Sequence, residues 1–165
     1  LPCKTGFGGV KKVYFADYGT LGAVTIDADG TISAIAGSEA WFEFDVKGNS
    51  SLETTITSSR ENGTTFYAQT LNLTLPYIDN ATQQELQLLA VSRPHMVVED
   101  YLGNQFLCGL ENGVECTGGT IVTGAAAGDL YGFTLVMEGQ EEKAPAFIDS
   151  GVITSAISAT QITPN

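Results

Sequence analysis

Alternating apolar and polar residues between positions 65 and 75 form the clearest pattern in the chain. Leu71, Leu73 and Leu75 are separated by an asparagine and a threonine, which is the period of two typical of a strand with one buried face. The polar positions then lie on the opposite face, where they meet water or another chain. The sequence therefore predicts a long strand here.

The residues that follow this strand predict one short helix. Asp79 and Asn80 offer side-chain oxygens to the first free amides of a helix, and Asn80 with Gln83 has the spacing of a capping box. Leu86 lies on its apolar face. The helix is expected to end just before Pro94, because the residue before a proline is pushed towards extended geometry.

Shorter apolar runs, bounded by turn residues, predict the remaining strands. They cover residues 10–17, 23–26, 31–35, 40–46, 52–60, 95–100, 105–109, 114–117, 130–138 and 144–148. Between them, the glycine-rich residues 118–128 are predicted to be a loop, since no lysine and no helix complete a phosphate-binding motif.

Ten or so strands and one helix predict a single, mainly β domain over residues 1–149, with residues 1–9 as an N-terminal arm. The expected architecture is an antiparallel β-sandwich or barrel of two packed sheets, with the one short α-helix on one side. Residues 150–165 have few large side chains and are expected to form an extended C-terminal arm that packs on a neighbour. The expected core residues are Trp41, Leu73, Leu86 and Phe106.

The strand predicted over residues 52–60 differs from the others because it is almost wholly polar. Leu52 and Ile56 are its only large apolar side chains. Such a strand contributes little to the core of a monomer. We therefore expect its faces to meet water or other subunits.

The charge balance argues against binding in a nucleic-acid groove. Seven Lys and Arg against 19 Asp and Glu give a net charge of −12, and the acids outnumber the bases in both halves of the chain. A basic surface is needed to displace counterions from DNA. An acidic surface would instead let DNA pass without being held. Solubility alone is the more common reason for a low isoelectric point, and this alternative stays open.

Three cysteines, Cys3, Cys108 and Cys116, form no CxxC pair. A bridge between Cys108 and Cys116 is conceivable because they fall in successive strands, but buried free thiols are the preferred interpretation in a chain without a secretion signal. No apolar run is long enough for a membrane span. Because the chain begins at Leu1, the question whether a targeting segment or pro-segment precedes it stays open.

Catalytic signatures are missing from the sequence. His95 is the only histidine, so one chain cannot build a metal site from several imidazoles, and the residue is expected to be structural. No GxSxG motif is present. Glu99 and Asp100 are adjacent and point to opposite faces of a strand. We expect neither an enzyme nor a bound cofactor or metal.

Several short segments of the sequence resemble segments of the tail tube proteins of long-tailed bacteriophages, whose fold is shared with the tube protein of type VI secretion. The similarity spans roughly residues 40–148. The segments on which the resemblance rests are Arg60-Glu-Asn-Gly-Thr-Thr-Phe-Tyr67, Leu71-Asn-Leu-Thr-Leu75, Glu85-Leu-Gln-Leu-Leu89, Val97-Val-Glu-Asp-Tyr-Leu-Gly-Asn104, Leu107-Cys-Gly109, Gly118-Gly-Thr120 and Gly128-Asp-Leu-Tyr-Gly-Phe133.

The resemblance implies a virion protein of the tail, assembled in the cytoplasm of a bacterial host. Six copies would close into a ring whose inner strands line a lumen, and stacked rings would conduct the genome. The implied partners are other copies of the chain, other tail proteins and DNA in transit. The expected lumen or subunit-interface residues are Glu53, Thr55, Thr57, Arg60, Glu99 and Glu115.

Two alternatives remain open. A virion protein of related fold, such as a tail hub, tail terminator or head-decoration protein, would share the subunit but not the stacked tube. A monomeric β-sandwich that binds a carbohydrate or another ligand belongs to a different class, and would need an exposed aromatic platform. Tyr18, Tyr77 and Tyr101 are scattered over different turns, so this alternative ranks lower.

Overall fold

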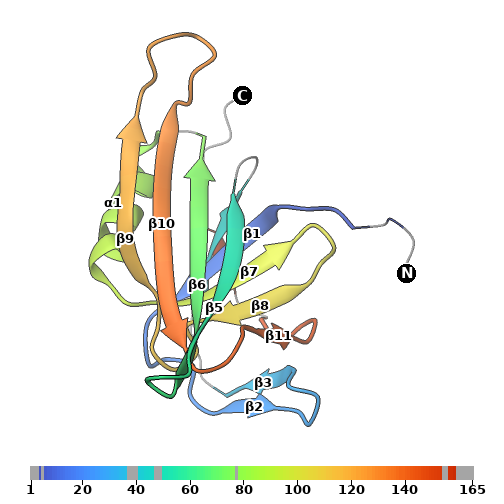
Figure 1. Cartoon of the computed structure of the whole chain (residues 1–165). Coiled ribbons are helices and arrows are strands. Elements are labelled where there is room, and N and C mark those ends of the chain that lie inside the picture. Colours follow the sequence, from blue (N-terminus) through green and yellow to red (C-terminus); the bar gives the residue numbers. More distant parts are fainter. Residues whose placement is uncertain are drawn as a thin grey trace.

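Two β-sheets pack face to face, and one helix closes the space between them at one end (Figure 1). The computed structural model describes residue 4, residues 6–36, 41–46, 50–76 and 78–153, and the backbone of residues 156–158. Within this part of the chain the two sheets do not close into a barrel, so the predicted mainly β sandwich with a single helix is confirmed.

The four-stranded sheet is antiparallel throughout and has the order β5-β6-β10-β9. Its strands are β5 (Ser51–Ser59), β6 (Thr64–Leu75), β10 (Gly132–Glu141) and β9 (Glu115–Val122). The prediction of a loop from residue 118 was wrong, because β9 continues to Val122. A Cβ atom on Gly119 would lie 2.5 Å from the carbonyl oxygen of Thr134, so this glycine permits close strand pairing rather than a loop.

The second sheet has eight strands in the order β12-β4-β1-β7-β8-β11-β3-β2. The strands are β1 (Val10–Ala16), β2 (Val24–Ile26), β3 (Ile32–Ile35), β4 (Trp41–Asp45), β7 (His95–Asp100), β8 (Gln105–Cys108), β11 (Ala146–Ile148) and β12 (Ala156–Ser158). Two pairs, β11 with β3 and β12 with β4, run parallel and depart from the predicted antiparallel arrangement. Through β12, part of the predicted C-terminal arm pairs with its own chain.

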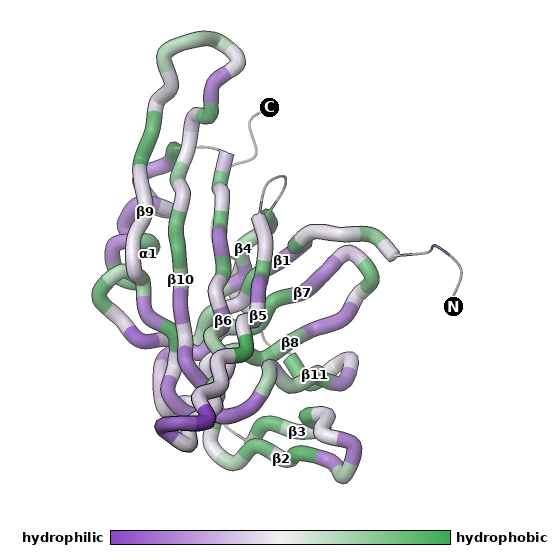
Figure 2. Tube along the Cα trace, viewed as in Figure 1, coloured by the Kyte–Doolittle hydropathy of each residue, from purple (hydrophilic) through white to green (hydrophobic). Residues whose placement is uncertain are grey.

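The central strands of the eight-stranded sheet are buried on both faces. Val13 and Phe15 of β1 pack towards the four-stranded sheet, while Tyr14 and Ala16 belong to a second apolar cluster on the opposite face. Figure 2 shows hydrophobic stretches along β7, β8 and β10 interrupted by more polar ones. Such a two-sided core explains why β1 and β7 read as nearly continuous apolar runs.

The predicted core is confirmed at three of its four positions. Trp41, Leu73 and Leu86 are buried. The prediction for Phe106 was wrong, because this side chain is only half-buried. It lines an open groove between the two sheets.

Helix α1 (Asn80–Val91) packs its Leu86 into the core between the sheets. The N-cap is Asp79, whose carboxylate accepts a hydrogen bond from the Thr82 amide at 3.4 Å. The predicted capping box of Asn80 and Gln83 was wrong, because Asn80 is already the first helical residue. The helix ends before Pro94, as predicted.

The two described cysteines are free thiols. Cys108 lies on β8 of the eight-stranded sheet, whereas Cys116 lies on β9 of the other sheet. Burial raises the pKa of Cys108 to about 12, and the nearby Glu141 carboxylate adds to this increase. The preferred interpretation of unbridged thiols therefore holds for this pair, and Cys3 lies outside the described residues.

Candidate assembly surfaces

One face of the four-stranded sheet is uncovered by any described element, whereas the other packs on the eight-stranded sheet and α1 (Figure 1). We call the uncovered side the polar face. Strand register places the following side chains on it: Ser51, Glu53, Thr55, Thr57, Ser59, Thr64, Phe66, Ala68, Thr70, Asn72, Thr74, Glu115, Thr120, Val122, Thr134, Val136, Glu138 and Gln140. Serine and threonine supply half of these side chains, so this surface is rich in hydroxyl groups that water can hydrate.

The charged residues of the polar face are all acidic and lie in one row across the sheet. Glu53 is opposite Thr70, Thr70 is opposite Glu138, and Glu138 is opposite Glu115. The four strands contain no lysine or arginine. Arg93 approaches the end of the row, with its Nε atom 3.9 Å from the Glu115 carboxylate. The row is therefore a band of negative charge running at right angles to the strands.

Four of the six residues predicted from the sequence, Glu53, Thr55, Thr57 and Glu115, lie on the polar face. Thr55 and Thr57 are exposed on the polar face, and Arg60 is exposed in the turn after β5. Glu138 was missed, although the alternation of Phe133, Leu135 and Met137 already assigns it to the polar side.

The structure does not bring Glu99 together with the other predicted acids. It lies on β7 of the eight-stranded sheet, where its carboxylate accepts hydrogen bonds from the Tyr14 hydroxyl at 3.1 Å and from the Gln105 amide at 3.3 Å. Burial raises the pKa of Tyr14, and the Glu99 charge adds to the effect. Glu99 is thus part of a half-buried, hydrogen-bonded cluster within the subunit.

Among the described residues, the two edges of the four-stranded sheet are long and have no partner strand. β5 has nine residues and β9 has eight, and each has a single neighbouring strand in this part of the chain. Because the four strands alternate in direction, β5 and β9 run in opposite directions. Exposed edges of this length are templates for pairing with another chain.

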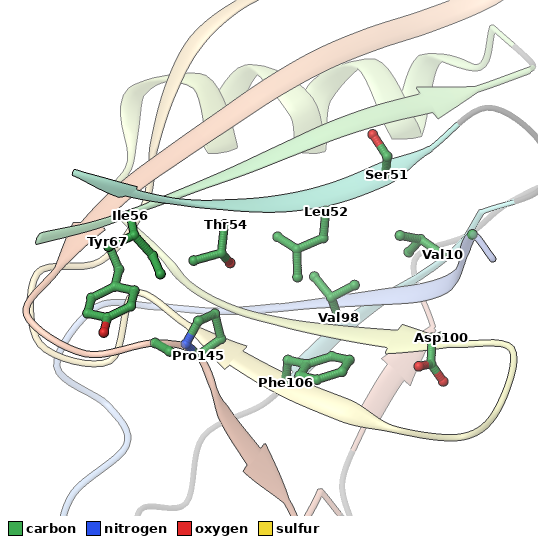
Figure 3. A pocket seen from close by; sticks show the side chains of 12 residues that line it. Val10, Ser51, Leu52, Thr54, Ile56, Tyr67, Val98, Asp100, Phe106 and Pro145 are labelled. Carbon is green, nitrogen blue, oxygen red and sulfur yellow. The ribbon is translucent and has the colours of Figure 1, made fainter. Parts of the chain in front are cut away.

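A groove of about 520 Å³ opens between β5 and the eight-stranded sheet. Figure 3 shows Leu52 projecting from β5 towards Val98 and Phe106 and Ile56 lying beside Tyr67, whereas Ser51 points the other way. Ile56 is 65% exposed. Among the described residues that line the groove, Asp100 is the only acidic one. An exposed apolar cleft beside an unpaired edge is typical of a protein interface.

The two sheets are joined at the turn after β8 by buried polar contacts. The Gln69 side-chain oxygen accepts a hydrogen bond from the Gly109 amide at 3.0 Å, and His95 Nδ1 lies 2.7 Å from the Gly109 carbonyl oxygen. His95 Nε2 accepts from the Gly19 amide at 3.2 Å, so Nδ1 must carry the proton. His95 is structural, as predicted.

Glu141 is a buried acid at the end of β10. Its carboxylate accepts hydrogen bonds from the backbone amides of Glu111 and Asn112, the latter at 2.8 Å. Desolvation raises its pKa, partly offset by these amide donors. The residue holds the turn before β9 against the end of β10.

No protein-family model matches the chain, and neither a curated protein nor a solved structure matches it. In the described part of the chain, no helix is long and apolar enough to cross a membrane. Among the same residues, no three His, Cys, Asp or Glu side chains are grouped so as to hold a metal ion.

Proposed function

We propose that this chain is a virion structural protein, the major tail tube subunit of a bacteriophage, which forms stacked hexameric rings that line the conduit for the genome. The observation that carries the proposal is the polar face, an uncovered antiparallel sheet bearing hydroxyl groups and only acidic charges. Like charge removes affinity for DNA. A bore lined by this face would let DNA slide past.

The strand directions support a closed ring. A copy rotated about an axis parallel to the strands would bring its β9 beside β5 of the first copy. The two would run antiparallel, because β5 and β9 run in opposite directions within each subunit and the rotation keeps the strand directions. Repeating this head-to-tail contact would close a ring and leave no unpaired edge in the four-stranded sheet.

Electron microscopy of the purified protein, with sedimentation velocity on the same sample, tests the proposal. Tubes or stacked rings with an open bore are the expected result. A single ring that never stacks would favour a tail terminator, tail hub or head-decoration protein. A monomer at high concentration would contradict assembly and favour a ligand-binding sandwich, for which the apolar groove of Figure 3 is the candidate site.

A further inference from the structure

The groove beside β5 has a counterpart at the opposite edge of the same sheet. There α1 packs behind β9, with Leu86 directed into the core. Leu88 and Val91 are 68% and 85% exposed. Helical geometry places both on the side of α1 turned away from Leu86. Large apolar residues adjacent on one helix surface are unusual outside an interface.

We propose that Leu88 and Val91 of one copy dock into the groove between β5 and the eight-stranded sheet of the next copy. The inference rests on the proposed function and names the contact that holds neighbours together within a ring. It adds a second layer of packing to the pairing of sheet edges.

The position of the two surfaces follows from the rotation that pairs the edges. Such a rotation keeps each subunit's polar face on the same side, so the elements behind the sheet also meet behind it. Behind β9 lies α1, and behind β5 lies the groove. When β9 of one copy meets β5 of the next, the outward side of α1 therefore reaches the mouth of that groove.

The chemistry of the two surfaces is complementary. The groove is lined chiefly by apolar side chains, including Leu52, Ile56 and Phe106. Helix α1 carries no basic residue, and its only acid is Glu85, which is one turn from Leu88. Apolar contacts at the centre of an interface, without buried unpaired charge, are what stable association needs.

The occupant is a second copy rather than a small ligand or the arm of a neighbour. A small-molecule pocket buries most of its ligand, whereas this groove is open along β5, where Ile56 is 65% exposed. The described part of the N-terminal arm is already engaged within its own chain, since the Phe7 ring packs edge-on against Tyr101 with centroids 5.0 Å apart.

Two variants test the contact from its two sides. The helix variant carries Leu88→Glu and Val91→Glu, and the groove variant carries Ile56→Glu. All three side chains are more than half exposed, so the subunits should keep the wild-type circular dichroism and urea midpoint. Ile26→Glu is the matched control, because Ile26 is 46% exposed on β2, outside the lining of the groove.

Sedimentation velocity should show assembled wild type and Ile26→Glu, while the helix variant and the groove variant each remain monomeric. An equimolar mixture of these two variants should give one-to-one dimers and nothing larger. The helix variant still offers an intact groove and the groove variant still offers an intact α1, so one helix-to-groove contact can form in the mixture. Every other helix-to-groove contact places a glutamate against the apolar groove or inside it.

The remaining outcomes overturn the proposal. Assembly of both variants like the wild type would refute this contact and leave the proposed tube intact. Assembly of the helix variant alone would mean that another segment fills the groove. A mixture that stays monomeric, or that forms rings, would refute the pairing of these two surfaces. A wild type that never assembles would refute the tube and the contact together.

Discussion

The opposed pair Glu138 and Glu115 gives the sharpest electrostatic prediction about the isolated subunit. Directly opposed residues on neighbouring strands have side chains about 5 Å apart, and at that distance two unit charges repel by about 0.8 kcal/mol in water. Screening lowers this to about 0.7 kcal/mol at about 0.01 M salt and about 0.4 kcal/mol at about 0.15 M salt. Glu138→Gln should therefore raise the free energy of unfolding by these amounts.

Glu53→Gln is the matched control, because Glu53 lies two strands from Glu138 in the same row. At about 10 Å its repulsion is about 0.3 kcal/mol at about 0.01 M salt and about 0.1 kcal/mol at about 0.15 M salt. Urea unfolding of dilute monomers at both salt concentrations measures the two differences. The reasoning fails if Glu138→Gln destabilises the subunit, or if Glu53→Gln gives the larger salt-dependent gain.

Three further predictions concern the interior. Gln69→Leu leaves the buried Gly109 amide without its acceptor and should lower the free energy of unfolding by about 1–3 kcal/mol in urea; no loss would refute the role of this contact. A disulfide reagent applied to the native protein in a Cys3→Ser background should modify Cys116 quickly and Cys108 only on unfolding, and equal rates would contradict the burial of Cys108. The fold raises the pKa of Glu141. At a pH above the ordinary pKa of a glutamate, this side chain therefore holds a proton more often in the native state than in the unfolded chain. Stability should therefore fall, relative to Glu141→Gln, as the pH rises from about 4.5 through the raised pKa, and parallel pH profiles of the two proteins would contradict this.

The strands were predictable wherever local alternation was strong. Leu71, Leu73 and Leu75 assign β6 and its buried face without any tertiary information, and Pro94 fixes the end of α1. The polar strand β5 was also identified as one that contributes little to the core, and the structure places it at an open edge.

Features that depend on contacts distant in sequence could not be predicted. Gly118 and Gly119 suggest a loop, and only the close approach of β10 makes them part of a strand. Phe106 has the composition of a core residue, but its exposure depends on how far β5 stands from β8. Glu141 stands in an acidic stretch of the sequence. Its burial depends on hydrogen bonds from the amides of residues 111 and 112, which are distant in the sequence.

The acidic row across the polar face was only partly visible in the sequence. Glu53 and Glu115 were selected as acids, but their alignment with Glu138 follows from the register of three strand pairs. Register is set by packing and turn geometry over the whole sheet.

A cryo-electron microscopy reconstruction of the assembled wild-type protein tests the central claim most directly. The account predicts a tube in which the four-stranded sheets of all subunits form the inner wall, with Glu53, Glu138 and Glu115 facing the bore as one ring of carboxylates per layer. An assembly in which the eight-stranded sheet lines the channel, or in which the polar face is buried between subunits, would contradict it.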